Sequence, residues 1–152
     1  MWANELDANI HVAIMTEPYL SKVRSGEKYI ESRLTKVNIS PFRRAAEGDI
    51  VLFKRSGGAI LAMALIERVE FEHLTAPDGP ASLAEKYADG LGYEPGYVET
   101  KQHAKFASLL WLREVRDLPA TPLEKRGRQA WVTLHAGHQC DSAKFDPSSM
   151  LF

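Results

Sequence analysis

The sequence predicts an α+β fold, a small β-barrel with short helices covering its ends. Apolar runs with the length and composition of strands recur along the chain, whereas segments with helical spacing are few and short. The 152 residues, 45% hydrophobic and 26% charged, suit one globular domain with its own core. The pattern contains no internal repeat and no sign of a second domain.

Net charge and cysteine content limit the kinds of function that we expect. The formal net charge is -1, so a nucleic-acid site would have to be a local basic patch. The single Cys140 excludes an internal disulfide and a cysteine metal cluster, and it agrees with a reduced, cytoplasmic setting. The first residues lack a signal-peptide pattern and no apolar run has membrane-spanning length, so we expect no membrane partner, and no cofactor is predicted.

The first expected element is a buried strand over residues 10–15, because nearly all of them are apolar. Thr16 and Pro18 then predict the start of a short helix, with an apolar stripe over residues 19–23. Gly26 is expected to end this helix, because a C-terminal cap needs a residue that adopts positive φ readily.

Residues 28–33 alternate as a strand does, but they carry charges that a core strand would not. The alternation predicts two faces, one with Lys28, Ile30 and Ser32 and the other with Tyr29, Glu31 and Arg33. Glu31 and Arg33 are then neighbours, either an ion pair on a solvated edge strand or two groups that hold one planar ligand. Spacing alone leaves both interpretations open; in a polar pocket, Tyr29 would be the aromatic residue that stacks on the ligand.

The second half of the chain adds further strands and a helical insertion. The expected strands cover residues 50–53, 59–71, 106–115 and 130–134. A glycine-containing turn over residues 55–58 predicts a hairpin, and helix signals begin at Ser82 and at Pro95. Trp111 and Trp131 lie inside apolar strand runs, so both are expected in the core.

Loops and chain ends carry the remaining candidate groups. Basic residues gather in the loops at Arg43, Arg44, Arg55, Lys125, Arg126 and Arg128. Singly they indicate ordinary surface charge, but around one opening they could hold a phosphate backbone. His135, His138 and Cys140 are potential metal ligands, but their spacing matches no zinc pattern, so no metal site is predicted. We expect a flexible N-terminus over residues 1–9, one domain over 10–136 and a loose tail over 137–152.

Residues 26–33, Gly-Glu-Lys-Tyr-Ile-Glu-Ser-Arg, resemble the signature G-x-K-T-I-E-x-R of the ASCH family, a branch of the PUA-like β-barrels. Three further segments agree in order: Glu-Pro-Tyr-Leu at 17–20, Gly-Asp-Ile-Val-Leu-Phe at 48–53 and Arg-Gln-Ala-Trp-Val-Thr-Leu at 128–134. The resemblance covers about residues 10–134 and departs from the signature at Tyr29, where threonine is usual.

The resemblance implies a PUA-like barrel with a pocket between barrel and helices, and a nucleic-acid-related binding function. The residues that it suggests for ligand binding, together with the hairpin, are Lys28, Tyr29, Glu31, Arg33, Arg55 and Ser56. The expected partner is RNA or a modified nucleoside. The near-neutral net charge favours a nucleoside or a short strand over long RNA.

An enzyme acting in the same pocket is the first alternative. Some similar proteins are amidohydrolases that act on acetylated cytidine, and the lysine of the motif is catalytic in them. If this chain is such an enzyme, or a ribonuclease, the resemblance implies Lys28 and Glu31 as its catalytic residues. Those enzymes have threonine at the position of Glu31 and an acid in the helical insertion, for which the candidates here are Asp89, Glu94 and Glu99. A carboxylate beside Lys28 would keep the lysine charged and a poor base, which favours binding. A protein-interaction adaptor is the second alternative; the sequence does not name the ligand or the oligomeric state.

Overall fold

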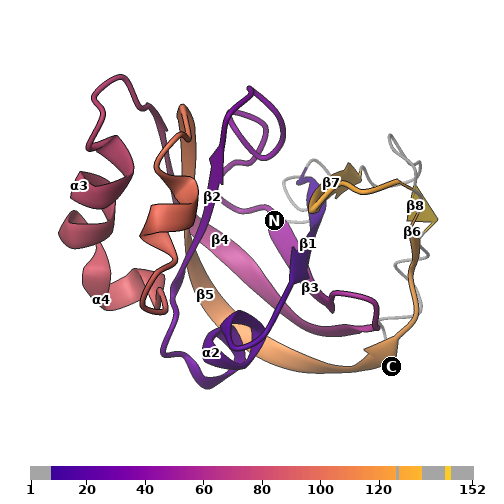
Figure 1. The fold of residues 1–152 in the computed structure, drawn as a ribbon. Coiled ribbons are helices and arrows are strands. Elements are labelled where there is room, and N and C mark those ends of the chain that lie inside the picture. Colours follow the sequence, from indigo (N-terminus) through magenta and orange to yellow (C-terminus); the bar gives the residue numbers. More distant parts are fainter. Residues whose placement is uncertain (1–7, 126, 135–142, 145–152) are drawn as a thin grey trace.

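The computed structural model describes residues 8–125, 127–134 and 143–144 (Figure 1). Most of the two terminal segments predicted from the sequence lies outside these residues, as do His135, His138 and Cys140. Within the predicted tail, β8 (Ala143–Lys144) pairs with β6 (Glu124–Lys125) in a separate two-stranded sheet. In the described part of the chain, no helix is both long enough and apolar enough to cross a membrane.

One six-stranded sheet forms the body of the domain, in agreement with the predicted α+β class. Its strands lie in the order β2 (Ile30–Thr35), β5 (Phe106–Thr121), β4 (Ile60–His73), β3 (Ile50–Arg55), β1 (Ile10–Met15) and β7 (Trp131–Leu134). The pairing of β1 with β3 is parallel and the other four pairings are antiparallel. The sheet therefore has two edge strands, β2 and β7, each with one neighbour in this sheet.

The long strands β4 and β5 curl the sheet into a half-barrel (Figure 1). Their register shifts at three places, between Ile60 and Ala62, Met63 and Leu65, and Ile66 and Arg68. Such irregularities bend a strand and increase its twist. The bend brings the edge strand β2 towards the opposite edge, where β1 and β7 lie, so that side chains can bridge the two.

Helix α2 (Tyr19–Ser25) joins β1 to β2 and packs Leu20 and Val23 into the core of the half-barrel. It ends as predicted at Gly26, whose φ of 85° lies in the left-handed region and whose N–H donates to the carbonyl of Val23. The N-terminal end differs from the prediction, because the helix begins after Pro18 without a side-chain cap. Because α2 ends at Ser25 and β2 begins at Ile30, Lys28 lies in the short connection between them.

The insertion between β4 and β5 contains α3 (Gly79–Lys86), α4 (Ala88–Leu91) and a short 3-10 helix, η1 (Val98–Lys101). Figure 1 shows α3 and α4 on the side of β2 and β5 that faces away from β1. Leu83 and Leu91 of these helices pack with Ile30 and Leu109 of the strands. The insertion therefore covers the outer face of the edge strand that carries the predicted motif.

The two tryptophans differ in environment, which corrects the expectation that both lie in the core. Trp131 is buried, and its indole N–H donates to Nδ1 of the buried His11 at 3.1 Å. Nδ1 is thus an acceptor, so the ring proton is on Nε2, which donates to Asp49 at 2.8 Å. Trp111 is half-buried on the outer face of β5, with the Arg68 guanidinium 4.1 Å from its ring centre. Alternation along β5 points this side chain out of the half-barrel, towards the helical layer that covers it only in part.

We expect Trp131→Ala to lower the free energy of unfolding by about 3–5 kcal/mol, because it removes a large buried ring and the donor to His11. Trp111→Ala, at the half-buried site, is the matched control and should destabilise less. Urea unfolding of both variants measures the difference. Equal midpoints for Trp131→Ala and the parent protein would contradict this account of the core.

Candidate functional site

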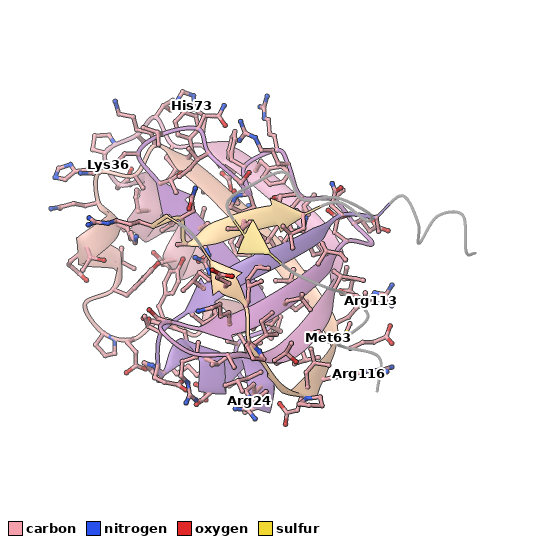
Figure 2. The ribbon with its side chains drawn as sticks, turned by 90° about the vertical axis from the view of Figure 1, so that its right-hand side faces the viewer. Arg24, Lys36, Met63, His73, Arg113 and Arg116 are labelled. Carbon is pink, nitrogen blue, oxygen red and sulfur yellow. The ribbon has the colours of Figure 1, made fainter. Side chains whose placement is uncertain are left out.

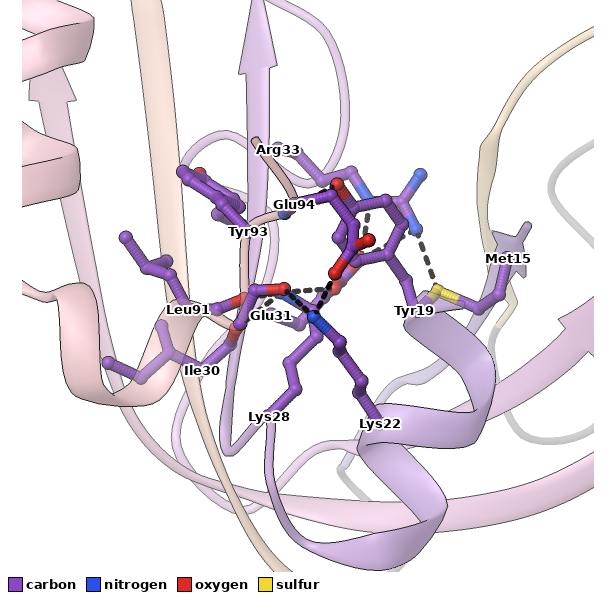
Figure 3. A network of polar contacts seen from close by, with 12 residues as sticks. Met15, Tyr19, Lys22, Lys28, Ile30, Glu31, Arg33, Leu91, Tyr93 and Glu94 are labelled. Carbon is purple, nitrogen blue, oxygen red and sulfur yellow. Dashed lines mark hydrogen bonds and ion pairs between the residues drawn. The ribbon is translucent and has the colours of Figure 1, made fainter. Parts of the chain in front are cut away.

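A cleft of about 290 Å³ opens between the edge strand β2 and the opposite edge of the half-barrel. We call it the main cleft. Its walls come from β1, the start of α2, β2, the insertion and the residue before β7. The side chains that carry its chemistry are Tyr19, Lys28, Glu31, Arg33 and Tyr93, labelled in Figure 3, together with Tyr97. The structure therefore brings the three charged motif residues Lys28, Glu31 and Arg33 together in one cleft.

Lys28 is 2% exposed and its ammonium group has polar partners on three sides. Nζ donates to the carbonyl of Ile30 at 2.9 Å and to that of Leu91 at 2.6 Å, and it lies 3.6 Å from Oε1 of Glu31. The rings of Tyr19 and Tyr93 lie 5.7 and 5.6 Å from it. Burial lowers the pKa of Lys28, while the negative charge of Glu31 acts in the opposite direction.

Glu31 is 3% exposed, and its two oxygens have different surroundings. Oε2 accepts from Nε of Arg33 at 2.8 Å and lies 2.6 Å from Nη2 of the same guanidinium. Oε1 faces Nζ of Lys28 only at 3.6 Å, beyond hydrogen-bonding distance. Oε1 therefore keeps acceptor capacity in a cleft whose other charges hold the carboxylate in place.

Arg33 bridges the two sides of the half-barrel, a role that the sequence did not predict. Besides Glu31, its guanidinium donates to the carbonyl of Ile14 in β1 at 3.1 Å and to that of Ala130, just before β7, at 3.2 Å. It also lies 5.3 Å from the ring centre of Trp131. We call these contacts across the gap the Arg33 clasp. All three guanidinium nitrogens have partners within the chain, so a bidentate contact from Arg33 to a base would require these bonds to be replaced.

Three tyrosines form the aromatic wall of the cleft, and two of them come from the insertion. The rings of Tyr93 and Tyr97 lie 4.4 Å apart, and that of Tyr19 lies 5.5 Å from Tyr97. The hydroxyl of Tyr93 shares a hydrogen bond with Ser32. Burial raises the pKa of Tyr93 above its ordinary range and that of Tyr97 to about 12, so both hydroxyls stay protonated. Tyr93 and Tyr97 were not predicted, because the pattern marks them only as part of a helical insertion.

Tyr29 does not line the main cleft. It is 43% exposed and lines a separate cleft of about 270 Å³ on the outer face, together with Arg68 and Trp111. The predicted division into two faces is therefore wrong at its start, since Lys28 lies with Glu31 and Tyr29 lies on the other side. The physical reason is that β2 begins only at Ile30, so strand alternation does not extend back to residues 28 and 29.

The other predicted candidates lie away from the main cleft. Arg55, at the end of β3, forms an exposed ion pair with Glu17 at 3.2 Å, and the N–H of Ser56 donates to the carbonyl of Met15 at 2.8 Å. None of the candidate acids Asp89, Glu94 and Glu99 lines the main cleft. Glu31 is the carboxylate that does. Within the described ranges, no group of three or more His, Cys, Asp or Glu side chains could hold a metal ion.

The fold is a curled half-barrel with few short helices, which matches the PUA-like α+β fold. Among solved structures, the ASCH protein of Zymomonas mobilis matches with a TM-score of 0.59 and 13% identity, over 74% of this chain and 72% of that one. Two single-substitution variants of that protein match at TM-scores of 0.58 and 0.59 and 13% identity. They cover 73% and 75% of this chain and 73% and 74% of theirs. No model of a known protein family matches the sequence, and no curated protein matches it.

This chain therefore has the ASCH fold, which confirms the fold expected from the sequence motif. At 13% identity the likeness establishes the fold, and the chemistry has to be argued from the cleft.

Arg33→Leu should lower the free energy of unfolding by about 3 kcal/mol, because it breaks the clasp and removes the nearest cation of the buried Glu31 carboxylate. Arg55→Leu removes an arginine from an exposed ion pair and should change stability by less than about 1 kcal/mol. Urea unfolding of the two variants tests the clasp. The clasp would have no structural role if the two variants had equal stability.

Lys28 and Lys22, a residue of α2 whose carbonyl accepts from the N–H of Lys28, should affect the pH dependence of stability in opposite directions. The folded-state pKa of Lys28 lies below the ordinary 10.5, so between those two values the unfolded chain binds more protons and stability rises with pH. Lys28→Met should remove this rise. Glu94 raises the pKa of Lys22. The stabilisation that Lys22 contributes is therefore present below pH 10.5 and is lost only as the pH passes the folded-state pKa of this lysine.

Lys22→Met is therefore the matched control for this prediction. From neutral pH to about pH 10, the unfolding free energy of Lys22→Met should follow the slope of the parent protein, whereas that of Lys28→Met should rise less. Urea unfolding at several pH values measures both slopes. Parallel curves for the parent and Lys28→Met would show that Lys28 titrates alike in the folded and unfolded chains.

Proposed function

We propose that the main cleft binds a nucleobase, as part of RNA or of a modified nucleoside, and that this protein is a nucleic-acid-related binding module. The observation that carries the proposal is the position of Glu31, whose Oε1 keeps acceptor capacity on the floor of a cleft walled by tyrosines. A carboxylate accepts from the exocyclic amino group of cytosine, and an aromatic ring stacks on a base.

Size and charge agree with this ligand class. The volume of about 290 Å³ lies at the lower end of that of small-molecule sites, which suits a ligand of nucleoside size. Lys28, Arg33 and Lys101 line the cleft, and among the described lining residues only Glu31 is a carboxylate, so positive charge is in excess there although the whole chain carries -1. The ASCH fold and the motif over residues 26–33 support the same class of ligand.

Hydrolysis of an acylated nucleoside is the second candidate, because burial lowers the pKa of Lys28 and a neutral amine could act as a base or nucleophile. The surroundings of Nζ argue against it. Two carbonyls accept from Nζ and Glu31 lies beside it, an arrangement that stabilises the ammonium form. In the ammonium form Nζ has no lone pair with which to attack a substrate, so binding ranks first.

Calorimetric titration of the parent protein with cytidine tests the binding proposal. Glu31→Gln should weaken binding by about 1–3 kcal/mol, because an amide replaces the carboxylate acceptor. Glu85→Gln makes the same change in the separate cleft that Tyr29 lines, and it should leave the affinity for cytidine unchanged. Circular dichroism of Glu31→Gln verifies that the variant is folded.

A turnover assay separates binding from catalysis. The parent protein incubated with N4-acetylcytidine should bind it without releasing acetate. Release of acetate that disappears in Lys28→Met would put the enzyme first. Neither binding nor turnover would refute both proposals and favour the adaptor alternative.

A further inference from the structure

A second cavity adjoins the main cleft on the other side of the Arg33 clasp. It has a volume of about 360 Å³ and shares Arg33, Thr35 and Ala130 with the main cleft. We call it the side compartment. Its own walls are Asn38, Ile39, Ser40, Arg44, Gln129 and Trp131. A ligand that occupies both cavities would therefore pass over the clasp, and the side compartment is large enough for more than a single phosphate group.

The polar groups of the side compartment suit an anionic ligand. Among the described residues that line it there is no carboxylate, whereas Arg33 and Arg44 contribute guanidinium groups. Nη1 of Arg44 donates to Oδ1 of Asn38 at 3.2 Å and to the carbonyl of Phe42 at 3.1 Å. Neutral acceptors thus orient this guanidinium while its charge remains available to a ligand.

Among the described residues, most exposed arginines of the domain, unlike Arg44, are paired with a carboxylate. Arg24, Arg55, Arg68, Arg113 and Arg116 each form an ion pair with a carboxylate. Arg44 forms no ion pair with any residue that the structure describes. Figure 2 shows Arg113 and Arg116 on one side of the molecule and Lys36, next to the side-compartment residue Thr35, on the other.

Ile39 adds an apolar surface to the same compartment. Its side chain is 50% exposed, and the neighbouring Val37 is exposed as well. Trp131, which is 5% exposed, also lines the compartment. An apolar wall beside an uncompensated guanidinium fits a nucleoside with its phosphate better than it fits an inorganic anion.

We propose that the two cavities bind adjacent nucleotides of one single strand, with a base in the main cleft, the next nucleoside in the side compartment and a phosphate of the strand on Arg44. The inference rests on the proposed function, which it narrows from a nucleoside to a strand of at least two nucleotides. The Arg33 clasp lies between the two sites and keeps both walls in position.

The test compares cytidine, cytidine 5′-monophosphate and the dinucleotide CpC as ligands of the full chain. The parent protein should bind CpC at least about tenfold more tightly than cytidine and more tightly than the monophosphate, since a charge-assisted hydrogen bond and a second base contact are added. Arg44→Gln should remove most of this gain and change the affinity for cytidine less than about twofold. The matched control Arg113→Gln, which makes the same charge change on β5, should alter neither.

Salt dependence gives a readout that a structural effect of the substitution would not produce. Arg44→Gln should reduce the slope of log affinity for CpC against log salt by about 0.7, the value for one lost phosphate contact on a single strand. If the parent bound CpC no more tightly than cytidine, or if Arg44→Gln left both affinity and slope unchanged, the second site would be refuted while the main cleft stood. Equal affinities for the monophosphate and CpC would refute the second nucleoside. If none of the three ligands bound, the proposed function itself would fail.

Discussion

The Arg33 clasp is the interaction on which the shape of this domain depends. A curled sheet whose edge strands do not pair leaves a gap between them. Arg33 extends from one edge to carbonyl groups on the other, and one of these carbonyls belongs to Ala130, directly before β7. A guanidinium group suits this position, since its planar arrangement of donors can bond to several acceptors at once while it keeps its charge. The same side chain forms the boundary between the main cleft and the side compartment, so closure of the fold and division of the binding surface have one cause.

The buried charges beside the clasp bind the helical insertion to the sheet. Removing Lys28, Glu31 and Arg33 from water is unfavourable unless each group is fully hydrogen-bonded, and the alternating charges alone do not guarantee net stabilisation. For Lys28 one of the required acceptors is the carbonyl of Leu91, in α4. The insertion that carries this carbonyl also provides Tyr93 and Tyr97. The charged floor and the aromatic wall are therefore parts of one unit, and a shift of the insertion would change both together.

The sequence predicted the local features and missed those that depend on distant contacts. The strand over β1, the end of α2 at Gly26 and the burial of Trp131 follow from apolar periodicity and from glycine stereochemistry, which act over a few residues. The side on which Lys28 lies could not be predicted, because alternation holds only inside a strand and β2 starts two residues later. The sequence predicted a strand only over residues 106–115, whereas β5 extends to Thr121. Its polar second half pairs with β4 but has no apolar pattern of its own from which a strand could be predicted. Tyr93 and Tyr97 reach the cleft only through the packing of the insertion.

The distribution of charge explains how a chain of net charge -1 can offer a basic site. On the outer surface, carboxylates next to Arg24, Arg68 and Arg113 cancel most of the positive potential at short range. At the gap between the edge strands, Arg44 and Lys101 have no such partner among the described residues, and Glu31 is outnumbered by the cations around it. Because salt screens charges over about 8 Å at physiological ionic strength, such a field acts only on a ligand that is already in the gap. A local field of this kind favours short or flexible ligands that enter the two cavities, and it gives little attraction to a long duplex lying across the surface.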